Sequence, residues 1–178
     1  MGRSRYHVVE GGHTYFVTSS LNRWIPLFSI PECAQIFIDS LNWLSRQEHV
    51  DIHAWVLMEN HTHLILSSPV LSSDMKRMKS FTARRIVDHL KTRGPQFWLK
   101  EMGAGKKAHK VDQSYQVWQE GFHPKQMTSM EQLTQKATYI HNNPMQRWYV
   151  DAPEHWRYSS CRDYLGGEGL VAISRTIS

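Results

Sequence analysis

Two histidines one residue apart, His61 and His63, stand within an apolar run and could bind a metal ion. Successive side chains of a β-strand point to opposite faces, and each residue advances the strand by about 3.3 Å, so the pair would share one face with Cβ atoms about 7 Å apart. Two imidazole rings at that distance can converge on one cation. The spacing therefore predicts the protein part of a metal site on a strand.

A tyrosine and an amide stand near the end of the last long periodic segment. Tyr139 and Asn143 are four residues apart, a spacing that places both side chains on one flank of a helix. A phenol is a poor nucleophile at neutral pH and needs a nearby cation or base to favour its ionised form. Tyr139 could attack a phosphoryl group while the Asn143 amide oxygen completes the coordination of a cation that polarises a phosphoryl oxygen.

Hydrophobic periodicity predicts the elements that would position these groups. Alternating or continuous apolar runs rich in β-branched residues indicate strands, and apolar residues three and four apart indicate helices. Met58-Glu59-Asn60 has the length of a hairpin connection, so His61 opens the second arm of that hairpin. Strands are expected at 14–20, 51–57, 61–67 and 115–119, and helices at 31–48, 74–91 and 130–142.

Other residues mark the expected ends of these elements. Asp74 is the expected cap of the second helix, and Thr128 or Ser129 that of the last. Pro144 is expected to end the last helix, because proline cannot continue the hydrogen-bond ladder. Residues 94–114 contain three glycines and are expected to form a mobile loop.

The order of these elements predicts an α+β fold. Strand, helix, strand, strand, helix and strand form the ferredoxin-like split β-α-β-β-α-β arrangement, here with an additional C-terminal helix that carries Tyr139. The antiparallel sheet of this fold buries one face under two helices and leaves the other available. If His61 and His63 lie on the available face, a metal can bind there.

An excess of positive charge favours an anionic partner. The 178 residues include 21 Lys and Arg against 16 Asp and Glu, which gives a net charge of +5 and a pI near 9.3. Seven Trp and seven Tyr could stack on unpaired bases, although most large aromatic residues of any domain belong to its core.

The chain is expected to form one domain over residues 1–178, with a core at about 12–144 and a tail at 145–178. Cys33 and Cys161 are too few for a disulfide framework, which favours a reducing, cytoplasmic setting. No apolar run approaches the roughly 20 residues of a membrane span, and charged residues interrupt the N-terminal segment. Neither a membrane anchor nor a signal peptide is expected.

Taken singly, each of these features also fits an ordinary structural role. A His-x-His pair can be a hydrogen-bonded pair in a strand, and a tyrosine on a helix flank usually packs against its neighbours. Basic residues on a helix usually form a solvated face. Only the ordered combination of a histidine pair with a tyrosine and an amide favours a phosphoryl-transfer site.

Five parts of the sequence, taken in order, resemble one known family. They lie at 11–28, 54–64, 117–122, 139–144 and 156–160. They are similar to the opening strand and loop, the metal-binding hairpin, the last core strand, the end of the catalytic helix and the C-terminal signature of the HUH single-tyrosine nucleases. Within that family, the resemblance is to the REP-associated tyrosine transposases of bacteria. It covers nearly the whole chain.

The resemblance implies that His61, His63 and Asn143 hold a divalent cation, Mg²⁺ or Mn²⁺, and that Tyr139 is the nucleophile. Tyr139 would attack single-stranded DNA, release a 3′-hydroxyl and stay joined to the 5′-phosphate until a later 3′-hydroxyl reverses the link. The implied substrate is a hairpin formed by a palindromic repeat, with an adjacent unpaired segment. The expected contacts with the DNA backbone are Lys76, Lys79, Arg84, Arg85, Lys106, Lys107 and Lys110.

Relatives with this mechanism include dimers that exchange the tyrosine helix, whereas the repeat-associated branch is compatible with the monomer that we expect here.

Some positions depart from the family pattern or compete with it. The residue between the histidines is usually bulky and apolar, and Thr62 is a mild change there. Two other tyrosines could compete with Tyr139 as the nucleophile. Tyr115 stands on a predicted strand and Tyr149 follows Pro144, so neither lies one helical turn before an amide ligand as Tyr139 does. Two other histidines could be accessory groups, but His141 is expected to point away from that flank and His123 lies in no predicted element.

Three functions remain open from the sequence. The first is a metal-dependent transposase that cuts and rejoins hairpin DNA. The second is a domesticated, non-cleaving protein that binds hairpin DNA in repression or genome organisation. The third is an unrelated metal-dependent phosphoesterase that uses water as its nucleophile. A covalent adduct between protein and DNA is expected only from the first.

Overall fold

A four-stranded antiparallel sheet forms the centre of the protein, whose computed structural model describes residues 8–9, 11–47, 49–108 and 114–175. The order of the strands is β2-β3-β1-β4, as the split β-α-β-β-α-β arrangement requires. The predicted α+β ferredoxin-like fold is therefore confirmed. The strands are β1 (Thr14–Ser20), β2 (Asp51–Leu57), β3 (His61–Ser67) and β4 (His123–Gln126).

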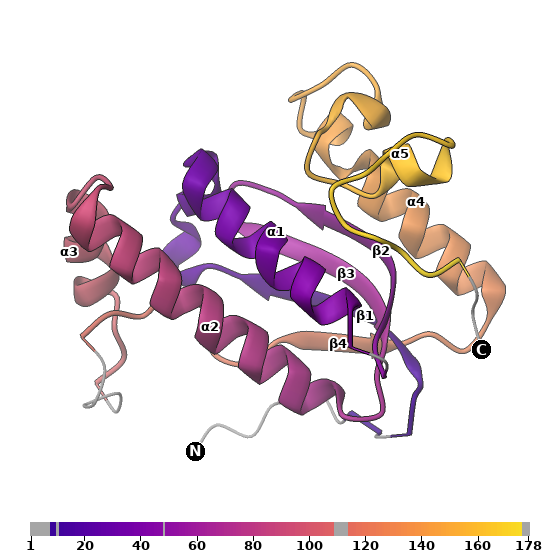
Figure 1. Cartoon of the computed structure of the whole chain (residues 1–178), viewed down its shortest axis with the longest axis horizontal. Coiled ribbons are helices and arrows are strands. Elements are labelled where there is room, and N and C mark those ends of the chain that lie inside the picture. Colours follow the sequence, from indigo (N-terminus) through magenta and orange to yellow (C-terminus); the bar gives the residue numbers. More distant parts are fainter. Residues whose placement is uncertain (1–7, 10, 48, 109–113, 176–178) are drawn as a thin grey trace.

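Helices lie on both faces of this sheet (Figure 1). Two long helices pack side by side on one face, and the later long helix, α4, lies against the other. In the described part of the chain, none of the helices combines the length and the apolar character needed to cross a membrane. The helices are α1 (Pro31–Ser45), α2 (Leu71–Thr92), α3 (Phe97–Ala104), α4 (Met130–Gln146) and α5 (Cys161–Tyr164).

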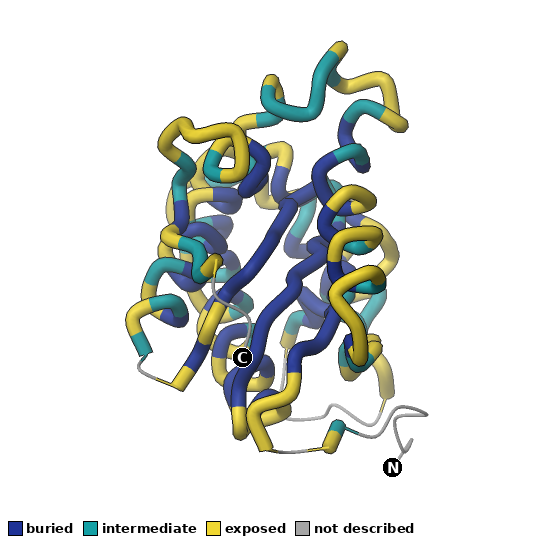
Figure 2. Tube along the Cα trace, turned by 90° about the vertical axis from the view of Figure 1, so that its right-hand side faces the viewer, coloured by how far each residue is buried: buried dark blue, intermediate teal, exposed yellow. Residues whose placement is uncertain are grey.

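The two faces of the sheet bury different clusters of side chains. On β1, Tyr15 and Val17 join the core beneath α1 and α2, whereas Phe16 joins a second core with Leu133 and Ile140 of α4. This division follows from the two-residue period of a strand. Figure 2 shows the central strands buried along most of their length and the helices exposed on one side. The face that the first two helices leave available is thus covered in part by α4.

The chain that follows α4 returns to cover the outer edge of β2. Leu57 N donates to Tyr158 O (2.9 Å), and Ser174 N donates to Ile52 O (2.7 Å). Unpaired strand edges promote association with other chains, so these bonds protect the β2 side of the sheet.

The loop predicted at 94–114 is wrong in part, because this stretch contains α3. Leu99 and Met102 lie three residues apart on that helix, and both are buried. Gly103 and Gly105 lie at its C-terminal end. These glycines favoured a loop, and a helix of two turns is too short to offset them with a clear period.

The strand predicted at 115–119 is also wrong, and the fourth strand is β4. Val117 and Trp118 are both buried, so the segment lacks the alternation of a half-buried strand. It packs beneath α2, where Trp118 Nε1 donates to Thr82 Oγ1 (3.0 Å). β4 contains Pro124, which a sheet accepts at an edge, and β4 pairs with β1 alone.

Four helix ends differ from the predictions, and the end of α2, at Thr92, differs by one residue. α1 ends at Ser45, three residues before the predicted end. α2 begins three residues before Asp74, which is buried and accepts a hydrogen bond from Ser68 Oγ (2.7 Å). Asp74 therefore fixes the first turn from inside the helix instead of capping it. α4 continues past Pro144 for two residues, because a proline near the end of a helix removes only one bond of the ladder.

Candidate active site

His61 and His63 lie at the start of β3 on the face that α4 covers. Their ring centroids are 4.9 Å apart, and both side chains are buried. Thr62, between them, is buried on the opposite side and donates to Val56 O (2.9 Å). The structure thus places both imidazoles on one face, as strand alternation predicts.

A neighbouring side chain orients each imidazole. His61 Nδ1 lies 2.7 Å from Asn60 Oδ1, and His63 Nδ1 lies 2.8 Å from Thr18 Oγ1. An imidazole that donates through Nδ1 keeps its lone pair on Nε2, the atom that can bind a metal. Partners of this kind fix the orientation of ligating histidines.

Burial keeps both imidazoles neutral. It lowers the pKa of His61 to about 4, with the positive charge of Arg147 adding to the effect and the Glu59 carboxylate opposing it. It lowers the pKa of His63 to about 3, with smaller contributions from His61 and Lys136. Because a histidine must be unprotonated to bind a metal, the pair is competent at neutral pH.

Tyr139 lies against this pair from α4. Its ring centroid is 5.3 Å from that of His63 and 6.1 Å from that of Phe16, and 38% of its surface is exposed. Lys136, one turn earlier, holds its ammonium 4.7 Å from the centre of the Phe16 ring and 5.1 Å from that of Tyr139. The phenol is therefore accessible to a substrate and stands beside a positive charge.

Asn143 lies one turn after Tyr139 and is buried. Its Oδ1 has no hydrogen-bond partner among the residues that the structure describes. An unpaired buried acceptor costs about 1–3 kcal/mol, and a bound cation would satisfy it. In the same residues no three His, Cys, Asp or Glu side chains form a metal-binding group. Two neutral imidazoles and one amide oxygen are the donors that fit a divalent cation here.

An ion pair borders the site on the side of His61. Arg147 Nη1 lies 3.1 Å from Glu59 Oε1. Arg147 is four residues after Asn143, so it extends the flank of α4 that carries the tyrosine and the amide. Lys136 precedes Tyr139 by one turn of the predicted helix, a spacing that indicates its place at the site. Arg147 lies beyond the predicted end of that helix and could not be placed from the sequence.

Ser129 is the N-cap of α4, and its Oγ accepts a hydrogen bond from Gln132 N (3.3 Å). Ser129 was one of the two caps predicted for this helix. The helix then packs on the sheet through the stripe that its period predicts, which includes Leu133 and Ile140. With that stripe buried, Tyr139 lies against His63, and Asn143 follows Tyr139 by one turn of the helix.

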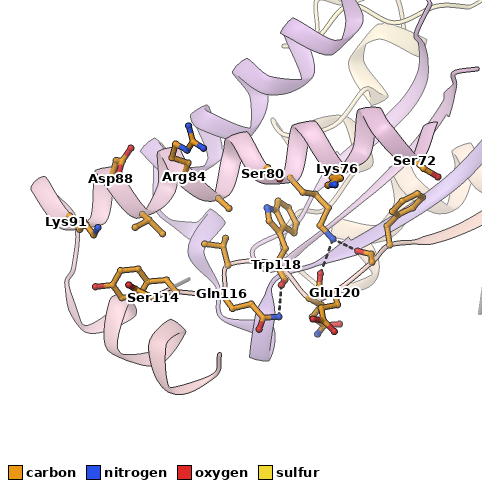
Figure 3. Close-up of a pocket in the computed structure, with 18 residues that line it drawn as sticks. Ser72, Lys76, Ser80, Arg84, Asp88, Lys91, Ser114, Gln116, Trp118 and Glu120 are labelled. Atoms are coloured by element: carbon orange, nitrogen blue, oxygen red, sulfur yellow. Dashed lines mark hydrogen bonds between the residues drawn. The ribbon is translucent and has the colours of Figure 1, made fainter. Parts of the chain in front are cut away.

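Three of the predicted DNA contacts line a groove of about 690 Å³ between α2 and residues 114–122. Figure 3 shows Lys76 and Arg84 on the α2 side of this groove. Lys79 crosses it, with its Nζ 5.6 Å from the centre of the Trp118 ring. The groove therefore combines positive charge with aromatic surface.

The other predicted contacts lie elsewhere. Arg85 lines a second groove, between α2 and α1, whose α1 side is acidic. Lys107 forms an ion pair with Glu120, with 2.6 Å between Nζ and Oε2. Lys106 is half-buried just beyond α3. Lys110 lies outside the described residues.

Neither competing tyrosine lies against the histidine pair. Tyr115 lines the groove beside α2, where the Lys91 ammonium is 5.5 Å from the centre of its ring. Tyr149 stacks on Trp156, with ring centroids 5.7 Å apart. Tyr139 is thus the tyrosine that the fold brings to the pair.

The two accessory histidines differ in position. His141 points away from the site, as predicted, and its Nε2 lies 2.9 Å from Ser160 Oγ. His123 was expected in no element, but it opens β4 and pairs with Thr18, the residue that bonds His63. Because paired residues of an antiparallel sheet point to the same face, His123 lies on the face of the histidine pair.

Comparison with known proteins gives a match of fold. No protein-family model and no curated protein matches the sequence. A solved structure of a REP-associated tyrosine transposase bound to a REP hairpin matches over 100% of both chains, with a TM-score of 0.66 and 21% identity. A structure from Deinococcus radiodurans, described as a candidate transposase, covers 80% of this chain and 97% of its own, with a TM-score of 0.46 and 20% identity. The first match establishes a shared fold over the whole chain.

Proposed function

We propose that this protein, which has the fold of a REP-associated tyrosine transposase, cleaves and rejoins single-stranded DNA through Tyr139. The proposal rests on the Tyr139 ring, 5.3 Å from the ring of His63, with the unpaired amide oxygen of Asn143 one turn further along α4. A phenol beside two neutral imidazoles and an unsatisfied buried oxygen fits phosphoryl transfer assisted by a divalent cation.

The proposed reaction is a transesterification. The phenol oxygen of Tyr139 attacks the phosphorus of a phosphodiester, so a new O–P bond forms and the bond from phosphorus to the 3′ oxygen breaks. The phenol gives up its proton and the departing oxygen gains one. A 3′-hydroxyl is released, and the 5′-phosphate stays on the protein. Attack by a 3′-hydroxyl reverses these steps without a nucleotide cofactor, because the phosphotyrosine conserves the bond energy.

His61, His63 and Asn143 are the proposed ligands of Mg²⁺ or Mn²⁺. When bound, the cation would polarise a phosphoryl oxygen. These donors are all neutral, whereas such cations prefer charged oxygen ligands, so the protein alone should bind them weakly. Phosphate oxygens of the DNA would add negative charge, and metal and DNA should therefore strengthen each other's binding.

Lys136 and Arg147 are the proposed partners of the reacting phosphate. Lys136 lies on the flank of α4 that carries Tyr139, and Arg147 directly follows the last residue of α4. The positive charge of each contributes to lowering the pKa of His63. Fixed positive groups beside a transferring phosphoryl group stabilise the charge of its transition state. The chain thus offers two cations besides the metal at the point of attack.

The groove beside α2 is the proposed path for the DNA backbone. The structural neighbour was solved with a REP hairpin, which suggests a hairpin substrate for this chain as well. Lys76, Lys79 and Arg84 would neutralise phosphates in this groove. Phe122 lines the groove and the next residue, His123, pairs with Thr18 beside the metal pair, so a strand that leaves the groove over β4 would reach Tyr139.

A covalent-adduct assay tests the proposal. The protein is incubated with Mn²⁺ and hairpin oligonucleotides that carry an unpaired flank and a label at the 3′ end, and the products are separated under denaturing conditions. We expect a labelled protein band that is absent from Tyr139→Phe and in EDTA. Tyr149→Phe is the matched control and should form the band as wild type does.

Other results would assign a different function. A band that persists in Tyr139→Phe would exclude this residue as the nucleophile. Hairpin binding that survives EDTA, with no cleavage of any hairpin offered, would indicate a non-cleaving DNA-binding protein. Turnover without an adduct would indicate a phosphoesterase that uses water.

A further inference from the structure

An exposed tryptophan stands beside the histidine pair and has no part in the chemistry proposed above. Trp24 belongs to the helical turn Asn22–Trp24 that follows β1, and 54% of its surface is exposed. Its ring lies nearly perpendicular to that of His61, with centroids 6.1 Å apart. More than half of the Trp24 surface is therefore open to a ligand beside the histidine pair.

The backbone of this turn has an unusual conformation. Arg23 and Trp24 have φ angles of 56° and 57°, in the left-handed region that bulky residues rarely adopt. Such conformations persist only where the surrounding structure fixes them, and they occur most often at functional sites. The turn is thus held in a form that its own residues disfavour.

Asn60 connects this turn to the metal pair. Its Oδ1 lies 2.7 Å from His61 Nδ1, and its Nδ2 lies 3.4 Å from Trp24 O. On the other side of the turn, Asn22 Nδ2 donates to Gly105 O (2.8 Å). One amide side chain therefore contacts both the ring that would bind the metal and the backbone that carries the tryptophan.

We propose that Trp24 is a stacking platform for an unpaired nucleobase next to the phosphate that Tyr139 attacks. The inference rests on the proposed function and names the group that is recognised at this edge of the site. Lys136 and Arg147 are the proposed partners of the phosphate, so the base next to it needs a contact of its own. An aromatic ring fixed near the metal pair supplies that contact, and ring stacking accepts all four bases.

This platform would position the strand without reading its sequence. A base that stacks on Trp24 restricts rotation of the nucleotide, so the adjacent phosphate meets the phenol in fewer orientations. Loss of the ring should weaken binding of the unpaired flank and slow cleavage, whereas the identity of the base at this position should matter little.

The test combines an abasic scan with variants of Trp24. Binding of a hairpin with an unpaired flank is measured in EDTA, with each flank nucleotide in turn replaced by an abasic one. In wild type, one abasic position should weaken binding by about tenfold. Trp24→Ala should weaken binding of the intact oligonucleotide by a similar factor and should show no further loss at that position. Trp24→Phe should retain most of the affinity.

Trp43 supplies the matched control. It is an exposed tryptophan on α1, with the Arg77 guanidinium 4.9 Å from the centre of its ring. Trp43→Ala should show the affinity and the abasic profile of wild type.

Each outcome bears on one proposal or on both. The platform is overturned if Trp24→Ala binds the intact oligonucleotide with wild-type affinity. It is also overturned if an abasic nucleotide weakens binding to Trp24→Ala as much as it weakens binding to wild type. Both results hold even if Tyr139 forms the adduct. A wild type that binds the hairpin but forms no adduct overturns the cleavage proposal alone. A wild type that binds no oligonucleotide, either in EDTA or with Mn²⁺, overturns both.

Discussion

The ammonium of Lys136 lies near both the Tyr139 phenol and the histidine pair. Its ammonium lies 5.1 Å from the centre of the Tyr139 ring, and its charge helps to lower the pKa of His63. We expect Lys136→Met to slow adduct formation roughly 10- to 100-fold, because a fixed charge at a reacting phosphate contributes about this much. Single-turnover rates at saturating DNA measure the effect.

Lys100→Met is the control for this variant, since Lys100 is exposed on α3, away from the site. It should react at the wild-type rate. An equal rate in Lys136→Met would show that the ammonium packs on the Phe16 ring without acting on the phosphate.

The unpaired oxygen of Asn143 predicts opposite effects on stability and on metal binding. Asn143→Leu removes a buried acceptor that lacks a partner, so the free energy of unfolding in EDTA should stay the same or rise by about 1 kcal/mol. The affinity for Mn²⁺ should fall, because a ligand is lost. Urea denaturation in EDTA and Mn²⁺ titration measure the two quantities.

Asn42 offers a matched comparison, because its Nδ2 donates to Leu170 O (3.0 Å). Asn42→Leu breaks a bond and should lower the free energy of unfolding. If Asn143→Leu is destabilised to the same extent and binds Mn²⁺ as wild type does, Asn143 is an ordinary buried amide.

β3 and α4 could be predicted because each carries its own period. Alternation places His61 and His63 on one face of β3, and the stripe through Leu133 and Ile140 turns Tyr139 of α4 toward them. The period of an element fixes which of its residues share a face before any partner is known. These parts of the site were therefore accessible from the sequence.

β4 and the partners of the histidines could not be predicted in this way. β4 consists of a proline and three polar or charged residues, so its sequence does not indicate a strand. It forms a strand because it pairs with the edge of β1. Thr18 orients the His63 imidazole only once β1 lies beside β3. Both facts depend on contacts between elements, which local patterns do not contain. Asn60 directly precedes His61, but the period of a strand does not specify which way its side chain turns.

Buried histidines on β3 and α4 predict that acid weakens the fold. Burial lowers the pKa of His61 and His141 to about 4 and that of His63 to about 3, below the value of about 6.5 in an unfolded chain. As the pH falls from about 6.5 toward 4, the unfolded chain binds more protons than the folded chain, so the free energy of unfolding falls.

Urea denaturation at about pH 7.5, 6 and 5 checks this dependence, with His141→Gln as the comparison because it leaves the metal pair intact. The variant should lose less stability than wild type between the two ends of this range. An equal loss in both proteins would show that carboxylates, and not these histidines, account for the response to acid.

The nucleophile and the histidine pair of the proposed site lie together within one chain. Tyr139 contacts His63 of the same chain, so no exchange of α4 between two copies is needed. We therefore expect the protein to act as a monomer, with the tyrosine helix serving its own metal pair.

Mixing two inactive variants tests this arrangement. His63→Ala keeps the nucleophile and Tyr139→Phe keeps the metal pair, so a mixture should form no adduct if each site is built within one chain. Recovery of the adduct in the mixture would show that α4 reaches the metal pair of a second copy.

The proposed function requires that Tyr139 becomes joined to the 5′-phosphate of a cut DNA strand. Its most direct test is mass spectrometry of the protein after reaction with hairpin DNA and Mn²⁺, digestion with a protease and trimming of the bound strand with a nuclease. We expect a peptide in which Tyr139 carries a nucleotide through its 5′-phosphate. A nucleotide on another residue, or cleaved DNA with every tyrosine unmodified, would contradict it.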